Sequence, residues 1–165
     1  SILERQIFRL REEHKKLMEL LTSFVETAST NEDLFLKSKK LTLKILDSKS
    51  KKDAVEIVES IFRKEFKIDK PFLKFFNNTS INDVESKTGF SFHKGAIYCG
   101  SFSKEKVIAL FDDEKVESMV VTVVLAGDEI GLLMLGSYDR SKYLGDEDTT
   151  FIEYIRDVLE KKLTK

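Results

Sequence analysis

The side chains that most often carry catalysis or hold a metal are few in this chain, namely His14, His93 and Cys99. An imidazole can activate a thiol as a nucleophile, and Cys99 with His93 is a conceivable pair for this chemistry. No third residue that would orient the imidazole can be named. A zinc site needs three or four ligands at recurring spacing, which His93 and Cys99 do not supply. We therefore predict no catalytic residue, no metal site and no enzymatic activity, and interpret Cys99 as a small residue packed beside Gly100.

Binding of a small molecule is the second kind of chemistry that the sequence suggests. Thr122 is a polar side chain in the middle of an apolar strand, and Gly136 leaves a gap in a sheet face that a ligand or a bulky neighbour could approach. The alternative is a dry core in which Thr122 donates to a backbone carbonyl group. The residues do not decide between the two, and they identify no cofactor. If a pocket exists, we expect six lining residues, which are Tyr98, Cys99, Phe111, Thr122, Met134 and Tyr138.

A predicted β-hairpin positions most of these residues. Its strands are Ser118–Leu125 and Ile130–Tyr138, joined by a tight connection at residues 126–129. Nearly every residue in both strands is apolar, so both faces of the sheet must be covered. A further strand is predicted at Phe72–Phe76. We expect the helices at the two ends of the chain to cover one face of the sheet, and residues 78–117 to cover the other.

Capping patterns predict where the helices of the first half begin. Thr30 with Asp33, and Ser50 with Asp53, resemble capping boxes, so one helix is expected to begin after each and to end near Asp47 and Phe66 respectively. Residues 79–97 are the least legible stretch. Further helices are expected at Ile81–Lys87, Ser103–Phe111 and Asp146–Leu163.

The N-terminal segment carries a heptad repeat, with apolar residues recurring at alternating spacings of four and three residues. A lone helix would expose this stripe to water, so we expect a partner. A second copy of the chain is favoured over folding back onto the chain's own domain. We therefore divide the chain into a coiled-coil dimerisation helix at residues 1–30 and a globular domain at residues 31–165. The predicted dimer interface, called the seam below, comprises Leu3, Ile7, Leu10, His14, Leu17, Leu21 and Phe24.

The residues that flank the seam change along the helix. Gln6, Arg11 and Glu13 flank its first half, whereas apolar residues, Met18 and Leu20 among them, flank its second half. The apolar face thus widens toward the globular domain, as expected if a two-helix coil broadens into a larger bundle. His14 lies on the seam itself, where a polar residue can fix the register of pairing or be tolerated while partly solvated.

Composition excludes several classes of partner. The 165 residues contain 28 Lys and Arg against 29 Asp and Glu, so the chain lacks the basic excess of a nucleic-acid-binding module. Seven lysines between residues 37 and 52 are interpreted as a solvated helix face. A single cysteine allows no intramolecular disulfide, and no apolar run reaches the roughly 18 residues that span a bilayer. We expect a cytoplasmic protein that binds neither membrane nor nucleic acid, and its start at Ser1 instead of Met suggests trimming upstream.

The order of these elements resembles that of a GAF domain, and Gly131-Leu-Leu-Met-Leu-Gly-Ser137 resembles its last strand. The chain is similar to the bacterial family called domain of unknown function 484, through its leading coiled coil, Cys99-Gly100, Glu105 with Leu110-Phe111, and Ser118 at the start of a strand. This resemblance implies an α+β fold with a GAF-like antiparallel sheet sandwiched between helices, preceded by a long N-terminal coiled-coil helix. It implies dimerisation and no established activity.

Two functions are compatible with this reading. The first is a regulatory or sensory module for signal transduction, in which a small molecule between the sheet and its looser cover acts through the terminal helices on the coiled coil. The second is a dimeric protein-interaction adaptor with a filled core and no ligand. The sequence names neither the ligand nor the protein partner.

Overall fold

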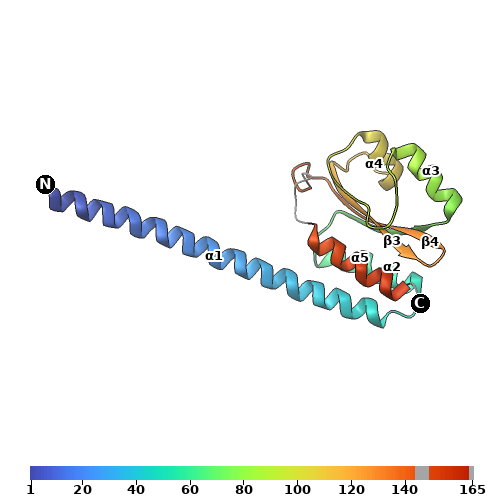
Figure 1. The fold of residues 1–165 in the computed structure, drawn as a ribbon, viewed down its shortest axis with the longest axis horizontal. Helices are drawn as coiled ribbons and strands as arrows, with labels where there is room; N and C mark the ends of the chain where they lie inside the picture. Colours follow the sequence, from blue (N-terminus) through green and yellow to red (C-terminus); the bar gives the residue numbers. More distant parts are fainter. Residues whose placement is uncertain (144–148, 164–165) are drawn as a thin grey trace. The chain divides into compact units, whose positions relative to one another are not determined.

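The computed structural model describes residues 1–143 and 149–163, and only the backbone at residues 23, 24 and 27–30. The chain forms two compact units, residues 1–37 and 38–165. The described elements confirm an α+β fold with an antiparallel sheet and a long N-terminal helix (Figure 1). In chain order they are α1 (Ile2–Asp47), α2 (Lys51–Lys64), β1 (Lys70–Phe76), α3 (Asn78–Thr88), β2 (Ile97–Gly100), α4 (Lys104–Phe111), β3 (Ser118–Ala126), β4 (Glu129–Ser137) and α5 (Thr150–Leu163).

Helix α1 runs without interruption from Ile2 to Asp47 (Figure 1). The predicted helix start after Thr30 is therefore wrong, although the side chain of Thr30 lies outside the described residues. The sequence contains neither proline nor glycine before residue 89 except Pro71, so nothing in α1 breaks the helical backbone. A residue that can cap a helix does not by itself end the preceding one. The division of the chain at residue 30 stays a prediction.

The other capping prediction is confirmed, and two further predicted helices are present. Ser50 caps α2, because its hydroxyl oxygen accepts a hydrogen bond from the backbone N–H of Asp53 at 3.1 Å. Helix α3 covers the predicted segment 81–87 but begins earlier, because Asn77 and Ser80 form a reciprocal capping box. Helix α5 matches the predicted C-terminal helix from Thr150 onward, whereas residues 146–148 of that prediction lie outside the described residues.

The four strands form one antiparallel sheet in the order β1-β4-β3-β2. The predicted hairpin is confirmed, with Ser118 opposite Ser137 and Ala126 opposite Glu129. Strand β2 was not predicted, since it has only four residues and follows a polar stretch with no clear alternation. It pairs with β3 through Ile97 opposite Thr122, which places it at one edge of the sheet.

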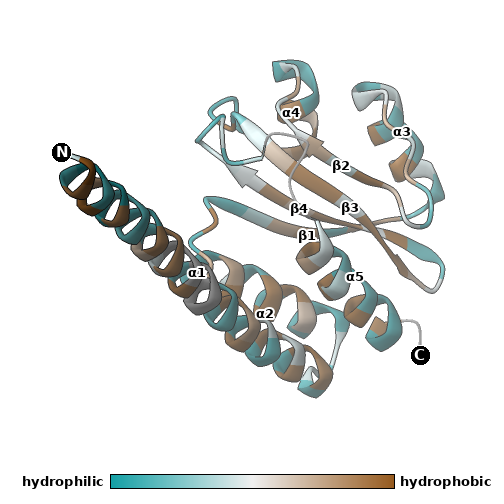
Figure 2. Ribbon diagram, turned by 60° about the vertical axis from the view of Figure 1, so that its left-hand side comes forward, coloured by the Kyte–Doolittle hydropathy of each residue, from teal (hydrophilic) through white to brown (hydrophobic). Residues whose placement is uncertain are grey.

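Each face of the sheet is covered by helices, as predicted from the two-sided apolar strands (Figure 2). Helices α2 and α5 lie on one side of the sheet and α3 and α4 on the other. In the first core, Phe62 of α2 and Ile155 of α5 pack with Leu133 of β4, and the last turns of α1 contribute Leu41 and Ile45. The second core is formed under α3 and α4 and includes Ile81, Val107, Phe111, Val121 and Met134.

Strand β1 forms the other edge of the sheet. Two features reduce the number of open N–H groups along that edge. Pro71 has no N–H to offer. The backbone N–H of Leu73 donates to a carboxylate oxygen of Glu59 on α2, at 3.1 Å. The edge of β1 is therefore partly satisfied by the chain's own groups.

Candidate functional site

The predicted seam lies on the surface of the unit formed by residues 1–37. His14 is exposed as well, and the side chain of Phe24 lies outside the described residues. Fully burying an aliphatic side chain contributes about 1.5–3 kcal/mol, so this row of residues is a substantial unsatisfied apolar surface. The exposed fractions of its described apolar residues are Leu3 65%, Ile7 42%, Leu10 63%, Leu17 64% and Leu21 54%.

The side chains that flank the seam are exposed along with it. The polar flank of the first half includes Arg11 and Glu13. The apolar flank of the second half includes Met18, Leu20 and Val25, and all three are exposed. In the second half of this segment, therefore, the apolar surface is wider than the two positions per heptad that a minimal two-helix contact would cover.

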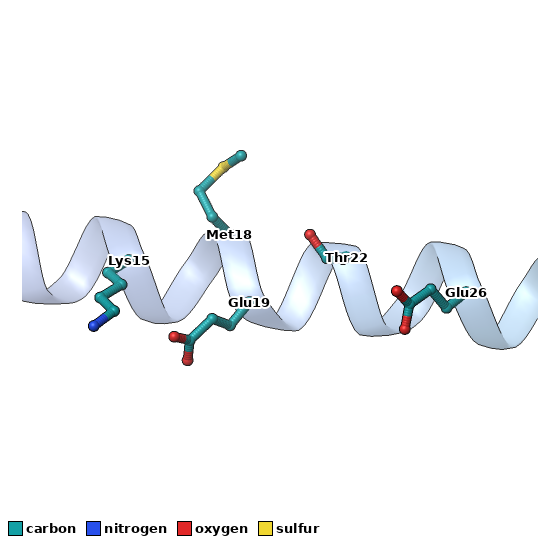
Figure 3. A pocket seen from close by; sticks show the side chains of 5 residues that line it. All are labelled: Lys15, Met18, Glu19, Thr22 and Glu26. Carbon is teal, nitrogen blue, oxygen red and sulfur yellow. The ribbon is translucent and has the colours of Figure 1, made fainter.

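A shallow hollow lies on the same helix, lined by the five residues in Figure 3. Lys15 and Glu19 point to one side of the ribbon, and Met18 points to the other. All five residues come from successive turns of one helix. The hollow is thus the groove between neighbouring side chains on a helix surface, without the enclosing walls that a small-molecule site requires.

The residues predicted to line a pocket lie on both faces of the sheet. Tyr98, Phe111 and Met134 belong to the core under α3 and α4. Cys99 packs against the opposite core. Thr122 also faces that side, since its hydroxyl lies 3.4 Å from the guanidinium of Arg156 on α5. A small molecule held on one face of the sheet would therefore contact only part of the predicted set.

The two features that suggested a pocket have partners inside the protein. The hydroxyl of Thr122 donates to the backbone carbonyl of Ala96 at 3.0 Å, as the dry-core alternative expected. At Gly136 the sheet is approached by a bulky neighbour, the ring of Phe111. A Cβ atom added to Gly136 would lie 2.9 Å from Cε1 of that ring.

Tyr138 lies just beyond β4 in an exposed polar cluster. Its hydroxyl donates to Oδ2 of Asp113 at 2.9 Å, and Nζ of Lys70 lies 3.5 Å from the same oxygen. The hydrogen bond from the backbone N–H of Lys115 is the main cause that lowers the pKa of Asp113. The hydrogen bond to Asp113 is the main cause that raises the pKa of Tyr138. The backbone N–H of Tyr138 also donates to Asp69 at 3.0 Å, so the cluster ties the end of β4 to the start of β1.

Over its whole length, residues 1–165, the chain matches a family model described as "Protein of unknown function, DUF484". The chain belongs to the DUF484 family. This confirms the resemblance to the domain of unknown function 484 family that the sequence showed. No curated protein matches the chain.

Sequence reasoning missed an aromatic cluster in this DUF484 protein. Phe90 stacks on Tyr98 with the ring centroids 4.2 Å apart, and Phe102 meets Phe90 edge-on at 5.2 Å. The ammonium group of Lys106 lies 4.8 Å from the centre of the Phe90 ring. The spacing of Phe90 and Phe92 in an otherwise polar stretch was the available signal. These rings pack around Tyr98, where the predicted ligand would have needed room.

The two histidines and the cysteine of this DUF484 chain do not all lie in one unit. His14 belongs to the unit of residues 1–37, whereas His93 and Cys99 belong to the unit of residues 38–165. Nδ1 of His93 lies 3.1 Å from the carbonyl oxygen of Lys94. Among the residues that the structure describes, no group of three or more His, Cys, Asp or Glu side chains is placed to hold a metal ion. None of the described helices is long and apolar enough to cross a membrane.

Proposed function

We propose that this DUF484 protein is a non-enzymatic homodimeric interaction module, in which residues 1–37 pair with a second copy through the seam. The observation that carries the proposal is the row of exposed leucine and isoleucine side chains on α1. A heptad stripe is self-complementary, because knobs on one helix fit holes between the same residues of another. A second copy of the chain is therefore a suitable partner.

The energetic scale supports this choice of partner. Each of the five described apolar seam residues is about half to two-thirds exposed, so its burial contributes about 1 kcal/mol or more. Over two chains this amounts to roughly 10 kcal/mol. Complexes with micromolar to nanomolar Kd have free energies of about 8 to 12 kcal/mol. Association itself has an entropic cost, so the seam alone does not account for such an affinity, and the exposed apolar flank residues Met18, Leu20 and Val25 must contribute as well.

The globular unit supports the adaptor reading of this dimer. Phe111 occupies the gap beside Gly136, and Ala96 satisfies the hydroxyl of Thr122. The core is thus filled by side chains at the two positions that would have favoured a ligand. In this proposal, the work of the protein is done by its surfaces.

A matched pair of variants tests self-pairing. Leu10 lies on the seam and Phe8 lies off it, and both side chains are exposed to a similar degree. Leu10→Glu should convert the dimer to a monomer, because it places a carboxylate in the contact. Phe8→Glu should remain a dimer. Sedimentation velocity of both variants and of the wild type measures this, and a dimeric Leu10→Glu protein contradicts the proposal.

A regulatory or sensory role is the second candidate, favoured by the resemblance of the element order to that of a GAF domain. Native mass spectrometry of the protein purified gently from its own cells distinguishes the two. A dimer with a reproducible extra mass supports the sensor, and a dimer at the sequence mass supports the adaptor.

A further inference from the structure

The polarity of the seam flanks indicates the direction in which two copies pair. We propose that the two copies of the segment 1–37 pair in parallel and in register. This inference rests on the proposed function, since it presupposes that the seam binds a second copy. It goes further, because a heptad stripe alone allows either direction.

In a parallel pair, each flank residue on one side of the seam meets the residue five positions later on the other helix. Gln6 then lies beside Arg11 of the second copy, so polar meets polar. Leu20 lies beside Val25 of the second copy, so two exposed apolar side chains cover each other. The third described flank contact sets Glu13 beside Met18. The Glu13 side chain is long enough to keep its carboxylate in water.

The antiparallel alignment that overlaps the whole seam pairs Leu10 with Leu21. It brings the polar flank of one helix against the apolar flank of the other. Every described flank contact then sets a charged side chain against an apolar one and removes water from that charge at a cost. These contacts are Glu4 with Val25, Arg11 with Met18, and Glu13 with Leu20.

The position of His14 on the seam also favours parallel pairing. In the parallel register it faces His14 of the second copy, so the polar side chains share one layer and the leucine layers on either side stay apolar. In the antiparallel alignment each His14 faces Leu17, which makes two mixed layers. A polar residue confined to its own layer is a common means of fixing coiled-coil register.

Disulfide cross-linking of single-cysteine variants tests the direction. The native Cys99 is first replaced in Cys99→Ser. Leu10→Cys and Leu17→Cys, each made in that background, should cross-link with themselves under oxidised glutathione, because identical seam positions face each other in a parallel pair. The matched control is Glu12→Cys, on the opposite side of the helix, which should give no cross-linked dimer. Two cysteines whose Cα atoms are more than about 7 Å apart cannot form the bond.

The outcomes separate this inference from the proposed function. Cross-linked dimers in both seam variants but not in the control support parallel pairing. A dimer by sedimentation that cross-links only when Leu10→Cys chains are mixed with Leu21→Cys chains overturns the parallel direction and leaves self-pairing intact. Cross-linking of Glu12→Cys equal to that of the seam variants also overturns it. Chains that sediment as monomers and form no cross-links overturn the proposed function and this inference together.

Discussion

Residues 1–37 and residues 38–165 use the same kinds of apolar side chain in opposite ways. Leu10 and Leu17 of the first unit are more than 60% exposed, whereas Leu132 and Leu133 of the second are fully buried. A sheet covered by helices on both faces buries its own apolar residues. A single helix has nothing within its own unit to cover its stripe. One region thus buries its apolar residues within its own unit, whereas the other leaves an apolar stripe exposed, which we propose a second copy covers.

The contrast between the buried and the exposed region can be tested most directly by truncating one leucine in each. Leu133→Ala should lower the free energy of unfolding by about 2–5 kcal/mol, since it leaves a cavity in a packed core. Leu17→Ala should leave the unfolding of the globular unit unchanged and weaken dimerisation. Urea denaturation and sedimentation equilibrium measure the two effects. Equal loss of core stability in both variants would contradict the division.

A second prediction concerns how completely the globular unit is filled. Gly136→Ala should destabilise the fold by about 1–3 kcal/mol, because the new methyl group would clash with the Phe111 ring. Adding Phe111→Leu should recover part of that loss, since the smaller side chain makes room. Thermal denaturation of the single and double variants measures this. A neutral Gly136→Ala would show that the space beside Phe111 is open.

The third prediction concerns His14, the polar residue in the exposed region. His14→Leu should tighten dimerisation by roughly tenfold or more, because it replaces a polar residue in the seam by an apolar one. Lys15→Leu, one residue away and off the seam, should leave the Kd unchanged. Sedimentation equilibrium of both proteins provides the measurement. An unchanged Kd in the His14 variant would place His14 outside the contact.

The smallest effect is expected at the polar cluster beyond β4. The raised pKa of Tyr138 means that its protonated form contributes stability below its ordinary pKa of 10.0, and this contribution is lost as the pH rises through the raised value. The lowered pKa of Asp113 means that its carboxylate contributes stability above the ordinary pKa of 3.8, which is lost as the pH falls through the lowered value.

Tyr138→Phe removes the hydrogen bond that links these two groups. The variant should be slightly less stable near neutral pH and should lose less stability than the wild type at alkaline pH. Chemical denaturation across the pH range measures the difference. Identical alkaline profiles for the two proteins would mean that the hydroxyl of Tyr138 makes no effective bond to Asp113.

The elements with strong local signals were predictable from the sequence. The hairpin over residues 118–137 is apolar on both faces and has a tight turn, and Ser50 caps α2 as its spacing with Asp53 indicated. Strand β2 was missed because four residues are too few to establish a period, so its formation depends on pairing with β3. The start predicted at Thr30 failed because the helical backbone simply continues through it.

The candidate site residues could be predicted only where they all lie on a single helix or strand. The exposed apolar stripe on α1 could be predicted because helical spacing alone puts its residues on one face, whereas its role as a dimer interface stays a prediction. The pocket prediction combined residues from strands and a helix, and the sequence does not say which face of the sheet each one occupies. Tyr98 and Cys99 are neighbours, so they point to opposite faces. That parity alone places Tyr98 and Cys99 in different cores.

The partly satisfied edge at β1 affects how readily further chains can add to the sheet. An edge strand with open N–H groups is a template to which further chains can add, and such growth leads to fibrils without a defined end. With Pro71 and the Glu59 carboxylate at this edge, β1 is a poor template. Self-association through a helical stripe, by contrast, is closed once two stripes have met. The chain therefore combines an exposed apolar stripe, which we propose pairs with a second copy, with a β1 edge that discourages the addition of further strands.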